Sequence, residues 1–174
     1  MKKVFLIIAI LVLVSFSNAA FINYDGVDVL IDETIGTGSS QTLIVIDWLS
    51  GVTPSHAWLY KYEGTKTFTD AYNAIETGTS GAFNWTESDF VTDINYNDGT
   101  DLHADTLGGW NSFWNKDSGS WQTNSSGINA QLLQNNGWSG AVINDADWGD
   151  LPPSIPVPEP LTIVMLGVGS VLIR

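Results

Sequence analysis

The stretch LIVIDWL, Leu43–Leu49, decides the fold of this chain. It is apolar on both faces of an extended backbone, which is typical of a strand covered from two sides. Loop residues bound it on either side, with Gly36–Ser40 before it and Pro54-Ser55 after it. The sequence therefore predicts a central β-strand, around which shorter elements pack.

Two flanking segments also read as strands. Val27–Ile31 alternates weakly after the turn dipeptide Asp25-Gly26, and Ala57–Tyr62 alternates more clearly before the turn Glu63-Gly64. The second segment places its large rings on one face and its remaining side chains on the other: Trp58, Tyr60 and Tyr62 against Ala57, Leu59 and Lys61.

One helix is expected over Thr69–Glu76. Thr69 can cap the free amides, Asp70 suits the positive helix end, and Gly78 can terminate the helix. Its buried face would consist of Ala71, Ala74 and Ile75. Asn129–Leu133 is expected to form a short helix or a bend.

Further short strands are expected near Phe90–Ile94, at Ser112–Trp114, around Trp121 and at Ala141–Ile143. Turn residues are spread evenly between these elements. The predicted fold class is therefore α+β and β-rich. It is one small domain over residues 20–151, built from short, mainly antiparallel strands with one or two short helices.

Composition excludes several classes of function. The 174 residues carry 6 Lys+Arg against 19 Asp+Glu, a formal charge of −13, and no Cys. Six basic residues cannot form the basic face of a sequence-independent nucleic-acid binder. Disulfide scaffolds, thiol nucleophiles and Cys-type zinc sites are excluded as well. His56 and His103 are the two imidazoles of the chain.

The N-terminus has the pattern of a secretory signal peptide over residues 1–19. Lys2 and Lys3 precede an unbroken apolar run, Val4–Val14, and small residues follow it. Cleavage is expected after Ala19. The alternative is a retained anchor, but the run rises only about 16 Å as a helix, whereas the hydrocarbon core is about 30 Å thick.

The C-terminus has three parts over residues 152–174. A Pro-rich linker leads into Val157-Pro158-Glu159-Pro160, an uncharged apolar run spans Leu161–Ile173, and Arg174 follows. The prolines hold an extended backbone that a processing enzyme can grip. The apolar run can enter a membrane as a helix, with the terminal Arg on the cytoplasmic side.

This ending resembles the PEP-CTERM sorting signal of exported bacterial proteins. The resemblance covers these residues: Val157, Pro158, Glu159, Pro160, Leu161, Thr162, Met165, Leu166, Gly167, Gly169 and Arg174. It implies recognition by an exosortase, transient insertion of 161–173 into the inner membrane, and a Gram-negative-type cell that often makes exopolysaccharide. The chain departs from the pattern in its short apolar run and in having one terminal arginine.

The middle of the chain resembles the ectodomains of a group of PEP-CTERM proteins of unknown function. The likeness rests on these segments: Ile46–Trp48, Ala57–Gly64, Gly109-Trp110, Phe113-Trp114, Gly119–Trp121, Ser125–Gly127 and Gly137-Trp138. The order of elements is more distantly similar to the transcobalamin-like C-terminal domain, a β-rich ligand-binding module. That second likeness suggests a ligand role and transfers no binding residue.

Two weak binding sites are open to test. Trp110, Trp114 and Trp121 can form a platform for a sugar or another ring, or they can fill the core. The oxygen-bearing side chains of Asp93, Asn95, Asn97, Asp98 and Asp101 can converge on calcium. The alternative for that segment is an ordinary Asn/Asp/Gly turn.

No residue pattern predicts catalysis. Nothing in the sequence sets His56 or His103 in a triad, and Glu63, Glu76 and Glu87 are as well explained by a solvated surface as by a glycosidase pair. We expect a non-enzymatic, exported cell-surface or extracellular-matrix protein with a structural or adhesive role. A carbohydrate- or small-ligand-binding module is the first alternative, and a secreted hydrolase is the second.

Overall fold

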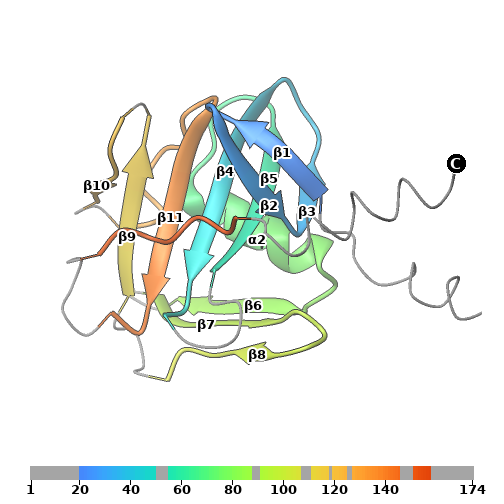
Figure 1. Cartoon of the computed structure of the whole chain (residues 1–174), viewed down its shortest axis with the longest axis vertical. Coiled ribbons are helices and arrows are strands. Elements are labelled where there is room, and N and C mark those ends of the chain that lie inside the picture. Colours follow the sequence, from blue (N-terminus) through green and yellow to red (C-terminus); the bar gives the residue numbers. More distant parts are fainter. Residues whose placement is uncertain are drawn as a thin grey trace, which may run out of the picture.

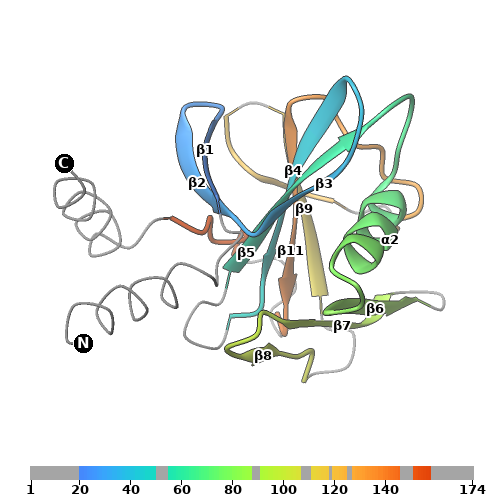
Figure 2. The ribbon, with the colours of Figure 1, turned by 90° about the vertical axis from the view of Figure 1, so that its right-hand side faces the viewer.

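The computed structural model describes residues 20–49, 55–87, 91–106, 111–117, 119–124, 127–145 and 151–157. Within these ranges the chain forms a six-stranded sheet, with a helix on one side and a two-stranded hairpin on the other (Figures 1 and 2). A three-stranded sheet lies across one end of the main sheet (Figure 1). The predicted β-rich class with mainly antiparallel strands is confirmed.

The central strand overlaps the predicted stretch but covers residues 40–47 instead of 43–49. β4, Ser40–Asp47, pairs antiparallel with β5, Ser55–Tyr62, and parallel with β11, Gly137–Ile143. Ile44 and Ile46 belong to the hydrophobic core on one face, and Leu43 and Val45 to the core on the other. Both faces of this strand are therefore buried, as its continuous apolar pattern predicts.

The order of strands in the main sheet is β10-β9-β11-β4-β5-β3. The elements not yet bounded are β3, Glu33–Gly36, β9, Asn111–Lys116, and β10, Gln122–Thr123. Two of the pairings are parallel, β11 with β4 and β3 with β5. These pairings were not predicted, because no local turn joins the two partners of a parallel pair.

The two faces of β5 follow the predicted alternation. Trp58, Tyr60 and Tyr62 pack into the core that the helix covers, whereas Ala57 and Leu59 pack into the core under the hairpin. The strand begins at Ser55, two residues earlier than predicted, so it also includes His56.

The helix α2, Phe68–Gly78, is longer than predicted and is capped by Thr67 instead of Thr69. Thr67 Oγ1 accepts a hydrogen bond from the Asp70 amide, and the Asp70 carboxylate accepts one from the Thr67 amide. This reciprocal pair is a capping box. The buried face adds Phe68 and Tyr72 to the predicted Ala71 and Ile75, whereas the predicted Ala74 is only partly buried.

The second candidate helix, Asn129–Leu133, is not a helix. Residues 128–130 form a turn, and Leu132 makes an isolated antiparallel bridge to Thr67. The Gln131 carbonyl accepts a hydrogen bond from the Phe68 amide at 3.2 Å. The segment therefore packs beside the first turn of α2 as the bend that the sequence allowed.

The smaller sheet consists of β6, Phe83–Glu87, β7, Val91–Asn97, and β8, Leu102–His103, all antiparallel. Its apolar side chains Phe83, Ile94 and Tyr96 join the same core as Trp58. The predicted strand near Phe90–Ile94 corresponds to β7.

The hairpin covers the other face of the main sheet. It consists of β1, Ala20–Tyr24, and β2, Val27–Ile31. The predicted turn is confirmed: Asp25 and Gly26 have φ of 52° and 77°, as the tight turn of a two-residue hairpin requires. The Tyr24 hydroxyl donates a hydrogen bond to the Gly137 carbonyl at 3.1 Å and thereby ties the hairpin to β11.

Residues 151–157 cross the same face as the hairpin (Figure 2). The Leu30 amide donates to the Pro156 carbonyl and the Ser154 amide to Asp47 Oδ2, each at 2.9 Å. Pro153 is buried and Ile155 packs into the core under the hairpin. We call residues 153–156 the strap. The prediction assigned them to the C-terminal linker, whereas they are packed on the domain.

None of the helices in the described ranges has both the length and the apolar character needed to cross a membrane. The predicted signal peptide with its cleavage site at Ala19, and the sorting residues Pro158, Glu159, Pro160 and Arg174, lie outside the described residues. Val157 is described and is 60% exposed.

Candidate functional site

The predicted tryptophan platform does not have the expected exposure. Trp114 is buried at 7% exposure, and its Nε1 donates a hydrogen bond to Ser112 Oγ at 3.0 Å. Trp121 is half-buried and meets the edge of Trp138 at a ring-centroid distance of 6.1 Å. Trp110 lies outside the described residues. Trp114 therefore follows the core alternative, whereas Trp121 packs against Trp138 and keeps part of its surface exposed.

The predicted calcium loop is divided between a strand and a turn. Asp93, Asn95 and Asn97 lie on β7, so only the residues after Asn97 form a turn. Asn95 Oδ1 accepts a hydrogen bond from the Asp105 amide at 3.2 Å. Asn97 Oδ1 accepts one from the Gly99 amide at 3.0 Å. Both oxygens thus serve backbone groups: that of Asn97 within an Asn/Asp/Gly turn, and that of Asn95 at Asp105, ten residues along the chain.

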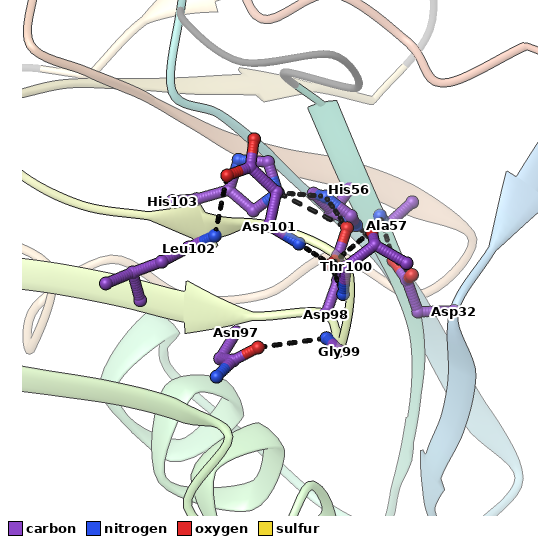
Figure 3. Close-up of polar contacts among 10 residues, drawn as sticks. All are labelled: Asp32, His56, Ala57, Asn97, Asp98, Gly99, Thr100, Asp101, Leu102 and His103. Atoms are coloured by element: carbon purple, nitrogen blue, oxygen red, sulfur yellow. Dashed lines mark hydrogen bonds and ion pairs between the residues drawn. The ribbon is translucent and has the colours of Figure 1, made fainter.

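The remaining members of that segment, Asp98 and Asp101, belong to a different arrangement. Asp101 Oδ1 accepts a hydrogen bond from the Leu102 amide at 2.8 Å. Asp98 points instead toward the two histidines of the chain (Figure 3). Asp98 is thus the residue that the predicted calcium loop shares with the histidine-containing cluster described next.

Three separate parts of the chain bring this cluster together. His56 lies near the start of β5, His103 ends β8, and Asp98 lies in the turn between β7 and β8. Asp32 joins from the corner between β2 and β3. We call His56, Asp98 and His103, with Asp32 behind His56, the His/Asp cluster. Figure 3 shows the two imidazoles next to each other, with both carboxylates beside them.

The polar atoms of the cluster are close enough to interact directly. His56 Nε2 lies 3.0 Å from His103 Nε2. Asp98 Oδ2 lies 3.7 Å from the first of these nitrogens and 3.4 Å from the second. Three atoms that can coordinate a metal, one from each side chain, therefore lie within 3.7 Å of one another.

The turn that carries Asp98 fixes the orientation of its carboxylate. Oδ1 accepts hydrogen bonds from the Thr100 amide, the Thr100 hydroxyl and the Asp101 amide, each at 2.7 Å. Burial opposes ionisation of this carboxyl, yet the hydrogen bonds from Asp101, from Thr100 and from the neighbouring imidazole together hold the pKa of Asp98 well below its usual range. Asp98 is therefore an anion whose second oxygen faces the histidines.

Asp32 fixes the ring of His56 from the opposite side. Both carboxylate oxygens of Asp32 lie 3.1 Å from His56 Nδ1. Asp32 Oδ2 also accepts a hydrogen bond from the Ala57 amide at 3.2 Å. A carboxylate on Nδ1 assigns the hydrogen of a neutral imidazole to that nitrogen, which leaves the lone pair on His56 Nε2 directed at His103 and Asp98.

Aromatic side chains enclose the cluster. The Trp48 ring lies 5.4 Å from the His103 ring, and the Tyr96 ring lies 4.8 Å from that of His56, as centroid distances. The side chains of His56, His103 and Asp98 are 7%, 1% and 12% exposed. Burial raises the pKa of the Tyr96 hydroxyl, and the carboxylates of Asp32 and Asp98 raise it further. The site is therefore largely buried and almost closed, with two carboxylates beside the imidazoles.

Two kinds of chemistry suit this geometry. Two imidazole nitrogens 3.0 Å apart can share one hydrogen, with one nitrogen donating and the other accepting. Alternatively, both nitrogens and the Asp98 oxygen can direct their lone pairs at one cation. The cluster is not predictable from the local pattern, because His56 lies outside the predicted strand and β8 has only two residues. The feature of the sequence that could have indicated the cluster is the presence of two histidines in a chain without cysteine.

The chain matches no protein-family model, no curated protein and no solved structure with which it was compared.

Proposed function

We propose that this chain is an exported cell-surface or extracellular-matrix protein that has a structural or adhesive role and is not an enzyme. Its export and sorting signals are the signal peptide at residues 1–19 and the PEP-CTERM-type ending at 152–174. Its partners are the secretion machinery, an exosortase and the exopolysaccharide of a Gram-negative-type cell.

The closure of the His/Asp cluster is the observation that carries the structural role. A catalytic histidine must reach a substrate, whereas the His103 side chain is 1% exposed and that of His56 is 7% exposed. The cluster joins the β2–β3 corner, β5 and the β7–β8 turn. Buried polar groups that connect three parts of a chain favour a structural centre over an active site.

The strap supports the proposed sorting. Its contacts with Leu30 and Asp47 keep the chain on the domain up to Pro156, and Val157 is then exposed. The expected recognition residues, Pro158–Pro160, follow directly in the sequence. A processing enzyme would therefore meet its motif immediately beyond a folded, acidic domain.

The carbohydrate-binding alternative has less support after the burial of Trp114. The hydrolase alternative calls for a pair of carboxylates in a cleft, whereas Glu63 and Glu87 are exposed on the surface. Neither alternative has an observation of its own among the described residues.

Intact-mass analysis of the exported protein tests whether both signals are recognised and cleaved. The full chain is expressed in a Gram-negative host with an exosortase and in the same host without the enzyme. We expect a chain that begins at Ala20 and ends near Pro160 in the first host only. Glu159→Ala should abolish the processing, while Ser154→Ala, on the strap, should not. A mature chain that keeps Arg174 in both hosts would contradict the sorting part of the proposal.

A further inference from the structure

We infer that His56, Asp98 and His103 form a binding site for a divalent transition metal of the Zn²⁺ class, with Asp32 as the residue that positions His56. The inference concerns the folded domain alone. It goes beyond the proposed function and does not depend on export or processing.

The distances fit a metal of this size. His56 Nε2, His103 Nε2 and Asp98 Oδ2 form a triangle with sides of 3.0, 3.4 and 3.7 Å. The point equidistant from these atoms lies about 2.0 Å from each, which matches zinc bonds to histidine nitrogen and to carboxylate oxygen. The three side chains could therefore hold the ion without a rearrangement of their backbone.

The directions of the lone pairs fit as well. The hydrogen bond from His56 Nδ1 to Asp32 leaves His56 Nε2 as the metal-facing nitrogen. A carboxylate behind a metal-binding imidazole is the usual second layer of zinc sites. Asp98 uses Oδ1 for its own turn and so presents Oδ2 to the histidines.

The ligand set selects the kind of metal. Two imidazoles and one carboxylate suit zinc and its neighbours, whereas calcium takes six to eight oxygen ligands. Asp98 supplies one negative charge, and Asp32 supplies another behind His56, so the site offsets the charge of a divalent cation. Three protein ligands leave the fourth tetrahedral position for solvent.

Such an ion would join the two sheets. His56 belongs to the main sheet, and Asp98 and His103 belong to the edge of the smaller sheet. A metal that binds the folded arrangement and not the unfolded chain raises the stability of the domain with its concentration. The expected consequence is a structural centre that holds the β7–β8 turn against β5.

The test is a Zn²⁺ titration of the full chain, purified in mild detergent with an affinity tag that contains no histidine and stripped with a chelator. Calorimetry should show one Zn²⁺ per chain, and the melting temperature should rise with added Zn²⁺. Co²⁺ should give the visible absorption of a tetrahedral nitrogen and oxygen site. Millimolar Ca²⁺ should neither compete nor shift the melting temperature.

Matched variants locate the site. Asp98→Asn keeps an oxygen for the turn but loses the charged ligand, so it should lose Zn²⁺ binding. Asp32→Asn should weaken binding about 10–100-fold, the usual effect of a second-layer change. Asp93→Asn, on β7 but outside the cluster, should bind Zn²⁺ like the wild type. Near-UV circular dichroism of the tryptophan-rich core reports whether each variant is folded.

The wild-type titration decides even if a variant does not fold. A Zn²⁺ concentration of about 100 micromolar is far above the concentration that an ordinary zinc site needs for binding. The inference is overturned if the wild type binds no Zn²⁺ at that concentration. One-to-one binding of Ca²⁺ in preference to Zn²⁺ would also overturn it. Zn²⁺ binding of unchanged strength in a folded Asp98→Asn variant would overturn it too, because the metal would then lie elsewhere.

Discussion

The Trp48 indole donates a hydrogen bond from Nε1 to the Ile94 carbonyl at 3.0 Å and so links the end of the central strand to the smaller sheet. Trp48 is fully buried, and its ring stacks on Tyr96 at a centroid distance of 6.3 Å. We expect Trp48→Phe to leave the carbonyl without its donor and to lose packing volume. The expected loss is about 2–4 kcal/mol of unfolding free energy.

Urea unfolding followed by circular dichroism measures this loss. Trp85→Phe is the control, since Trp85 is only partly buried and packs at the edge of the same core. Equal stabilities of the two variants would show that the indole hydrogen bond contributes nothing of its own.

Thr67 and Thr69 should differ in their contribution to stability, because Thr67 forms the capping box. Thr67→Ala removes the acceptor of the Asp70 amide and should cost about 1 kcal/mol. Thr69→Ala should be neutral or stabilising, because Thr69 Oγ1 is buried without a hydrogen-bond partner. Thermal unfolding of both variants checks the order. A larger loss of stability in Thr69→Ala than in Thr67→Ala would show that Thr69 is the N-cap, as the sequence suggested.

Acid should weaken the same capping box. The pKa of Asp70 is lowered below its ordinary 3.8, mainly by the hydrogen bond from the Thr67 amide. Burial partly opposes this shift, and the contacts with the Thr67 hydroxyl and with Lys66 add to it. A lowered folded pKa gives stability that is fully present above the unfolded value and is lost as the pH falls through the folded one. Stability should therefore fall below about pH 4 for this reason.

Asp70→Asn removes that pH dependence, so its stability should fall less steeply with acid than that of the wild type. Glu76→Gln, on the same helix, is the matched control and should keep the wild-type slope. Unfolding free energies measured from pH 7 to pH 2.5 provide the comparison. Parallel curves for wild type and Asp70→Asn would refute the assignment.

The strap depends on the absence of a side chain at Gly140. A Cβ placed there would lie 2.6 Å from Pro153 Cγ and 3.1 Å from the Val45 carbonyl oxygen. We expect Gly140→Ala to push the strap off the sheet and to cost about 1–3 kcal/mol. Hydrogen exchange should then speed up at the Leu30 and Ser154 amides, which the strap protects.

Ile155→Ala should speed up exchange at the same two amides, because it removes the apolar anchor of the strap. Leu151→Ala is the control, since Leu151 is 61% exposed. Unchanged exchange in Gly140→Ala would mean that the strap and the sheet are not in firm contact.

Local patterns in the sequence were sufficient for the parts of the fold that depend on neighbours along the chain. The burial of both faces of β4, the alternation of β5 and the turn at Asp25-Gly26 follow from periodicity and turn chemistry. The helix was found, but its first turn was misplaced because Phe68 and Tyr72 bury their rings only through tertiary packing.

The His/Asp cluster could not be predicted in the same way. Asp32, His56 and Asp98 meet only after β5 pairs with β3 and the smaller sheet docks on the main one. No local spacing records that docking. Trp114 illustrates the reverse case, because composition alone cannot separate an exposed ring from one that is buried against a sheet.

The parallel pairing of β4 with β11 has a consequence for the order of folding. Thr42 and Gly137 are partners in the register, so the central strand lacks one neighbour until the chain has been synthesised through β11, which ends at Ile143. Until then an apolar strand edge stays open to other chains. Long-range pairing of this kind is slow to form. The main sheet is therefore completed late, once the residues of β11 are available to pair with β4.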